Sequence, residues 1–294
     1  MTILVLGHGQ LGKSLCHELS HNNISYVSLS KLELDITNYD AVKNTITDLL
    51  ATVVINTAAY TNVDGAEDNQ EIAYAVNVEG PKNIALVCNS LDIPLIHIST
   101  DYVFDGMSNQ PYHPDSPVNP LSVYGKTKQS GEEAIQHSCR HYIILRTSWL
   151  FSIYGKNFLT TMIDLSKERD IISVVTNQIG CPTNADHLSQ VIVDSIKLIQ
   201  NLEFKSGIYH YADKEACSWY AFATEIFKII NADQTGMSTA LKPIIGSDFP
   251  AIAQRPSYSV LDSQKFCSTF NQPHLSWKEG LNQMIASYLH RSES

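Results

Sequence analysis

The sequence predicts an α/β fold: a doubly wound parallel sheet, followed by a smaller, irregular C-terminal lobe. In residues 1–150, short apolar runs alternate with amphipathic segments, the pattern of parallel strands that are buried by helices on both faces. In residues 151–294, prolines at positions 182, 243, 250, 256 and 273 break this alternation. We therefore expect one regular domain over residues 1–150 and a lobe of different architecture over residues 151–294.

The same runs place the individual elements. The strands are expected at residues 3–6, 25–29, 53–56, 95–98 and 142–145, where the apolar runs are short. The helices are expected at residues 11–19, 39–50, 71–91, 131–137, 185–200 and 219–230. A further run at residues 207–211 has the character of a strand, so the chain should return at least once to the main sheet.

Composition excludes several classes of protein. The formal net charge of −10, from 20 basic and 30 acidic residues, argues against nucleic acid or an anionic membrane as a partner. No apolar run reaches the roughly 18 residues of a membrane span. The six cysteines are scattered and form no C-x-x-C pair, which favours a reducing compartment. The first residues run into a glycine motif without a basic leader, so we expect a cytoplasmic protein.

Gly7, Gly9 and Gly12 form the G-x-G-x-x-G pattern between a strand and a helix, the context of a Rossmann-type dinucleotide site. Gly7 permits the tight turn, Gly9 admits the pyrophosphate and Gly12 lets helix and strand pack closely. Gln10 and Leu11 begin the helix whose amides would hold the anion. The alternative, a glycine turn without a ligand, is disfavoured by the downstream motifs.

The end of the second strand indicates the cofactor. An acidic residue there would bind the ribose 2′-hydroxyl of NAD, but this chain has Ser30 and Lys31, which suit a 2′-phosphate. We therefore expect NADPH, with NADH still open, since Lys31 could be only a solvated loop residue. Asp35 and Ile36 follow closely and could flank the adenine.

Tyr124 and Lys128 are the expected acid and its partner. They are spaced to share one helix face, where an ammonium would lower the pKa of the phenol below its ordinary value near 10. Thr100 and Asp101 follow a strand, so they should lie at the carboxyl edge of the sheet, where a hydroxyl can bind a substrate carbonyl. The alternative is a surface Tyr–Lys pair on an ordinary helix.

With these motifs the chain resembles the extended short-chain dehydrogenases/reductases, and among them the dTDP-4-dehydrorhamnose reductases. The resemblance runs through nearly the whole chain. It is carried by residues 56–67 (NTAAYTNVDGAE), 99–106 (STDYVFDG), 120–128 (PLSVYGKTK), 145–150 (LRTSWL), 177–183 (NQIGCPT) and 255–261 (RPSYSVL).

The resemblance implies an NAD(P)-binding Rossmann domain at residues 1–150 and a mainly substrate-binding lobe at 151–294, with segments that return to the main sheet. It implies that Tyr124 is the proton donor, that Lys128 is its partner and that Thr100 supplies the catalytic hydroxyl. It further assigns Ala58, Ala59 and Tyr60 to the cofactor, Thr61, Val63, Asp101 and Trp149 to the nucleotide sugar, and Asn77 to the central helix near the site.

Other residues have less specific readings. Arg255 is a candidate for the substrate diphosphate, whereas Arg146 is expected to be a structural ion-pair partner. Trp219 and Trp277 are expected to pack helices. Some relatives bridge a dimer through Mg²⁺ held by a Glu two residues after the third glycine. Ser14 stands there, so no metal is expected, while a homodimer stays open.

The expected activity is reduction of the 4-keto group of a dTDP-4-keto-6-deoxyhexose, above all dTDP-4-dehydro-L-rhamnose to dTDP-L-rhamnose, for polysaccharide synthesis. One alternative is a 4-reductase that makes another sugar, such as 6-deoxy-talose, fucose or a dideoxyhexose. Another is a noncatalytic nucleotide-binding regulatory subunit on the same fold, which the presence of Thr100, Tyr124 and Lys128 disfavours.

Overall fold

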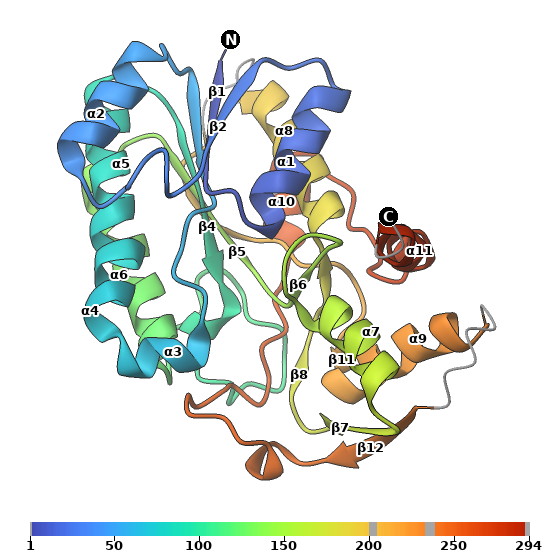
Figure 1. Cartoon of the computed structure of the whole chain (residues 1–294). Helices are drawn as coiled ribbons and strands as arrows, with labels where there is room; N and C mark the ends of the chain where they lie inside the picture. The colour runs from blue at the N-terminus through green and yellow to red at the C-terminus, as the bar shows by residue number, and fades with distance from the viewer. Residues whose placement is uncertain (1, 200–204, 233–238, 292–294) are drawn as a thin grey trace.

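The structure is a computed structural model that describes residues 2–199, 205–232 and 239–291. Within these residues, one sheet has the strand order β10-β5-β4-β3-β1-β2, and every pairing in it is parallel (Figure 1). Its strands are β1 (Ile3–Leu6), β2 (Tyr26–Leu29), β3 (Val53–Asn56), β4 (Leu95–Thr100), β5 (Tyr142–Thr147) and β10 (Gly207–His210). The predicted doubly wound sheet is confirmed, and β10 is the expected return of the chain.

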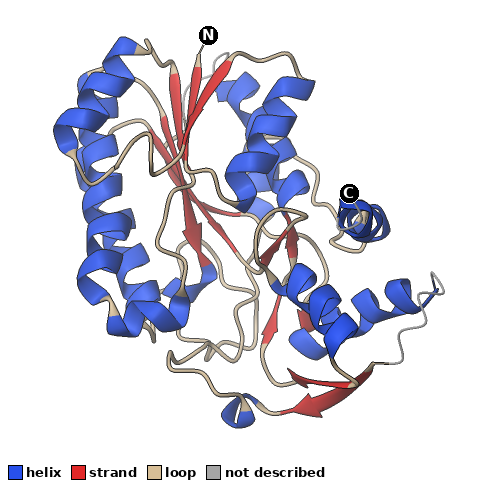
Figure 2. Ribbon diagram, viewed as in Figure 1, coloured by secondary structure: helices blue, strands red, loops and turns tan. Residues whose placement is uncertain are grey.

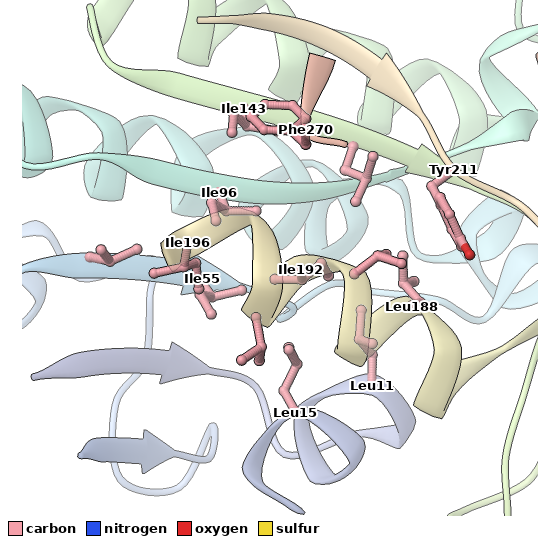
Figure 3. Close-up of a cluster of buried hydrophobic side chains, with 14 of the residues drawn as sticks. Leu11, Leu15, Ile55, Ile96, Ile143, Leu188, Ile192, Ile196, Tyr211 and Phe270 are labelled. Atoms are coloured by element: carbon pink, nitrogen blue, oxygen red, sulfur yellow. The ribbon is translucent and has the colours of Figure 1, made fainter. Parts of the chain in front are cut away.

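Helices cover both faces of this sheet, as Figure 2 shows. One face carries α2 (Tyr39–Asp48), α5 (Gly80–Ser90) and α6 (Val123–Ser138), and the other carries α1 (Gln10–His21), α8 (Ala185–Ile199) and α10 (Gln264–Thr269). Alternation within β1 shows why both faces need cover, since Leu4 packs in one core and Ile3 in the other. Figure 3 shows the second core, where Leu11 and Leu15 of α1 meet Leu188 and Ile192 of α8 beneath the strands.

The expected helix over residues 71–91 is interrupted in the structure. It divides into α4 (Gln70–Tyr74), a π-helical turn η1 (Ala75–Glu79) and α5, and the short helix α3 (Val63–Asp68) precedes it. The buried Asn77 lies in the π-helical turn and binds the backbone of Tyr60. A π-turn inside a helix often marks a functional region.

The C-terminal lobe has its own core beside the carboxyl end of the sheet. It contains the helices α7 (Phe158–Glu168), α9 (Trp219–Ala232) and α11 (Leu281–Arg291). Three small two-stranded sheets join β6 (Leu150–Phe151) to β9 (Thr183–Asn184), β8 (Ile179–Gly180) to β11 (Cys217–Ser218), and β7 (Ile171–Val175) to β12 (Ala240–Ile244). Two short 3₁₀ turns are η2 (Asp101–Val103) and η3 (Gly246–Asp248). The expected helix 185–200 is α8, and Gln200 lies outside the described residues.

Candidate active site

A cleft of about 770 Å³ runs along the carboxyl ends of β1 to β5 and reaches the C-terminal lobe. This edge is where ligands bind in doubly wound folds. The predicted site residues that line it are Gly7, Gly9, Gln10, Leu11, Gly12, Ser30, Lys31, Asp35, Ile36, Ala58, Ala59, Thr61, Val63, Thr100, Asp101, Tyr124, Lys128, Trp149 and Arg255. Tyr60 is not among the lining residues, because its backbone N–H and C=O are bound by Asn77 (2.8 and 3.2 Å), beside the cleft wall.

The turn after β1 fits a dinucleotide pyrophosphate. Gly7 has φ +99°, in the region that favours glycine, and a Cβ on Gly12 would run into the carbonyl oxygen of Gly7. A Cβ on Gly9 would meet no atom within 4 Å, so this backbone is open to a ligand. Because Gly9 caps α1 without a side chain, the first amides of the helix are available to an anion.

The other end of the cleft holds a carboxylate that the sequence analysis missed. Glu33 Oε2 accepts hydrogen bonds from the hydroxyl and the N–H of Ser30 (2.7 and 2.8 Å). These bonds lower the pKa of Glu33, so it is ionised at neutral pH. Ser30 and Lys31 line the cleft as predicted, but the hydroxyl of Ser30 is already engaged by an anion.

Thr100, Asp101 and Tyr124 meet at the centre of the cleft. Thr100 ends β4, and its hydroxyl donates to Asp101 Oδ1 (3.1 Å) and lies within hydrogen-bond reach of the Tyr124 phenol. Tyr124 stands in the first turn of α6, where the hydroxyl of Ser122 caps the helix by accepting from Gly125 N–H (3.1 Å). A Cβ on Gly125 would run into the carbonyl oxygen at position 102, so α6 lies directly against the segment after β4.

The expected lowering of the Tyr124 pKa is wrong. Burial raises the pKa of Tyr124 to about 12, and the hydrogen bond with Thr100 lowers it only in part. Lys128 lies one turn along α6 as predicted, but its Nζ donates to the carbonyl of Ile98 (2.7 Å) and lies 3.2 Å from His97 Nε2. Its amine is therefore engaged by β4, and burial of the phenol decides the pKa.

Asp101 is an unusual carboxyl at this site. It is 2% exposed, and burial raises its pKa to about 6, while hydrogen bonds to Ser259 and Thr100 act in the opposite direction. A carboxyl with such a pKa is a good acceptor for sugar hydroxyls and is only weakly held as an anion.

Trp149 and Trp219 form one wall of the cleft. Their rings stack with centroids 3.5 Å apart and an interplanar angle of 6°. Trp149 has φ +46°, which is rare for a bulky residue and turns the chain sharply after β5. The expectation that Trp219 only packs a helix is thus incomplete: it contacts Phe158 of α7 and also lines the cleft. Its place after β11, at the start of a helix, was the available signal.

The two arginines have different surroundings. Arg146 is buried and binds Glu132 through Nη2 (2.6 Å) and Nε (2.9 Å), and the hydroxyl of Ser99 also donates to this carboxylate. It is a structural ion pair, as expected. Arg255 lines the cleft and pairs with Asp64 at 3.1 Å, half-buried at the rim.

Two further searches concern metals and membranes. In residues 2–199, 205–232 and 239–291, no three His, Cys, Asp or Glu side chains gather as metal ligands would, and Ser14 is buried in α1. Across these ranges, none of the helices combines the length and the apolar character of a membrane span.

Comparisons with known proteins agree with this geometry. The family model described as RmlD substrate binding domain matches residues 1–290. The dTDP-4-dehydrorhamnose reductase of Aggregatibacter actinomycetemcomitans is 40% identical over 97% of this chain and 98% of its own length. A crystal structure of a dTDP-4-dehydrorhamnose reductase from Clostridium acetobutylicum superposes with a TM-score of 0.90 at 38% identity, covering 98% of this chain and all of that one.

The corresponding reductase from Bacillus anthracis, solved in complex with NADP, also has a TM-score of 0.90, at 36% identity over 97% of this chain and 99% of its own. The match spans both the sheet and the C-terminal lobe. This chain therefore belongs to the dTDP-4-dehydrorhamnose reductase family.

Proposed function

We propose that the protein reduces the 4-keto group of dTDP-4-dehydro-L-rhamnose to give dTDP-L-rhamnose, with NADPH as the reductant. The observation that carries this proposal is the meeting of the Thr100 hydroxyl and the Tyr124 phenol in one cleft that starts at the glycine turn and ends at Trp149. Family membership and the NADP complex of the Bacillus anthracis relative support the substrate and the cofactor.

The chain's own residues would divide the work along the cleft. NADPH, when bound, supplies the hydride that reduces C4. Tyr124, whose pKa is about 12, stays protonated near neutrality and gives its proton only as negative charge develops on the C4 oxygen. The hydroxyl of Thr100 stabilises the same oxygen by a hydrogen bond. Transfer of one hydride and one proton converts the ketone to the alcohol.

The substrate end would be formed by the paired indoles and by polar groups around them. Trp149 offers a flat apolar face to the deoxysugar, and Asp101 can accept a hydrogen bond from a sugar hydroxyl. Arg255 is the candidate for the diphosphate, which would compete with Asp64 for the guanidinium. The six free cysteines suit a reducing compartment such as the cytoplasm.

The decisive experiment incubates the protein with NADPH and a panel of nucleotide-linked 4-keto-6-deoxy sugars, followed by NMR of each product. We expect rapid oxidation of NADPH with dTDP-4-dehydro-L-rhamnose and a product with the L-rhamno configuration. A talo, fuco or dideoxy product would assign another reductase, and binding of nucleotide without turnover would point to a regulatory subunit.

A further inference from the structure

Behind the cleft, hydrogen bonds connect the backbone of Ala58 to the amine of Lys128. Asn56 Oδ1 accepts from Ala58 N–H at 3.0 Å, and Asn56 Nδ2 lies 3.1 Å from His97 Nδ1. His97 Nε2 in turn lies 3.2 Å from Lys128 Nζ. The three side chains are 0%, 0% and 2% exposed, so solvent does not compete for these bonds. Asn56 and His97 have no part in the mechanism described above.

The direction of this chain of bonds is fixed at its first member. A backbone N–H can only donate, so the amide oxygen of Asn56 faces Ala58 and its NH₂ group faces His97. Because an amide NH₂ also only donates, Nδ1 of His97 must be the acceptor. Burial and the nearby Lys128 hold the pKa of His97 well below its ordinary value, so the ring is neutral. Its single proton is therefore on Nε2, which faces Lys128.

A proton on His97 Nε2 constrains the charge of Lys128. An ammonium has three donors and no acceptor, whereas an uncharged amine can accept from Nε2–H and still donate to the carbonyl of Ile98 at 2.7 Å. The charged groups near the amine are His97 on β4 and Glu132 on its own helix, and Glu132 is itself bound by Arg146 of β5. Burial lowers the pKa of Lys128 to about 8 against the opposing effect of Glu132.

We propose that Asn56 and His97 set the charge of Lys128: Asn56 fixes the Nε2–H tautomer of His97, and this tautomer favours Lys128 as an uncharged hydrogen-bond acceptor beside Tyr124. His97 and Asn56 are thus positioning residues, and the inference rests on the proposed reductase function. Its consequence concerns the acid. A full positive charge next to a phenol favours the phenolate, so weakening that charge keeps Tyr124 in the protonated form that reduction requires.

The substitution Asn56→Asp tests this direction, because it keeps the shape and replaces the donor with an acceptor. One carboxylate oxygen can still accept from Ala58 N–H, and the other can accept a proton placed on His97 Nδ1. Nε2 then becomes an acceptor and favours the ammonium of Lys128. His97→Leu, which removes both contacts, is the matched control.

The primary measurement is the ¹⁵N NMR spectrum of the full-length protein labelled at histidine, with the His97 signals assigned by their loss in His97→Leu. We expect the Nε2–H tautomer in the wild type and the Nδ1–H tautomer in Asn56→Asp. The apparent pKa of the alkaline limb of the kcat profile should rise by about one unit or more in both variants. The Nδ1–H tautomer or an imidazolium in the wild type would overturn the inference, even if neither variant folds.

The kinetic arm separates this inference from the proposed function. Absence of turnover by the wild type would reject the reductase assignment, while the tautomer would still be read from the spectrum. Turnover by the wild type, together with a fall of the alkaline pKa in His97→Leu, would instead mean that His97 accepts a hydrogen bond from the ammonium, which overturns the inference alone.

Discussion

Trp149 and Trp219 stack face to face, with ring centroids 3.5 Å apart, although one follows the main sheet and the other begins a helix of the C-terminal lobe. A Cβ at Gly180 would lie 2.5 Å from Cε2 of Trp149, so the indole is pressed between β8 and the second ring. The cleft wall is thus built from both parts of the chain and has a fixed orientation before a sugar meets it.

Trp149→Ala should raise KM for the nucleotide sugar about tenfold and leave KM for NADPH nearly unchanged. Loss of an aromatic contact costs about 1 kcal/mol beyond the buried area, and 1.4 kcal/mol is a factor of ten. Trp219→Ala should act in the same direction, because it frees the first ring. Trp277→Phe, in the core of the lobe, is the control for packing. A large fall in Tm with unchanged kinetic constants would assign Trp149 to packing alone.

Tyr124→Phe should lower kcat by about 10²–10⁴ and leave the Kd for NADPH close to that of the wild type, because only the acid is lost. The buried ring keeps its packing against Tyr102. Stopped-flow measurement of NADPH oxidation gives kcat, and fluorescence titration gives Kd. Turnover near the wild-type rate would remove Tyr124 from the role of proton donor.

Glu33→Gln should strengthen binding of NADPH relative to NADH. Glu33 is ionised and holds the Ser30 hydroxyl, so a 2′-phosphate next to Ser30 would meet a negative charge. Lys31→Ala should do the reverse by removing the cation. Titration of both variants with both cofactors measures the effect, which we expect to be several-fold for an exposed pair. If Lys31→Ala leaves the ratio of the two Kd values unchanged, Lys31 is a solvated loop residue.

Asp101→Asn should change how stability depends on pH. The folded-state pKa of about 6 lies above the ordinary value of 3.8, so the folded protein binds the extra proton between these values. The contribution of this proton is therefore complete below about pH 4, lost as pH rises through 6, and on the order of 2–3 kcal/mol in total. Urea unfolding at pH 4.5 and 7.5 should show a smaller difference in Asp101→Asn than in the wild type. An equal difference in the two proteins would place the titration elsewhere.

The elements set by local pattern could be predicted from the sequence. The glycine spacing fixes the turn after β1, because each glycine has a steric reason that holds in any chain. The i, i+4 spacing likewise places Tyr124 and Lys128 on one face of α6, and both line the cleft.

What depends on tertiary surroundings could not be predicted. The pKa of Tyr124 is decided by burial, which the Tyr–Lys spacing does not encode. The pairing of Trp219 with Trp149 depends on how β11 meets β8, and the π-turn at Asn77 depends on a hydrogen bond to the distant Tyr60. Glu33 was missed because its role comes from a local turn that brings its carboxylate back to Ser30.

The position of β10 at the edge of the main sheet has a consequence for how this protein unfolds. The strand pairs with β5 through the register of His210 with Arg146, yet it arrives only after the chain has built much of the C-terminal lobe. A fragment that stops at residue 150 would expose the edge of β5 and lack α8, half of one core layer. The two parts are therefore one cooperative unit rather than exchangeable modules, and calorimetry should record a single heat-absorption peak.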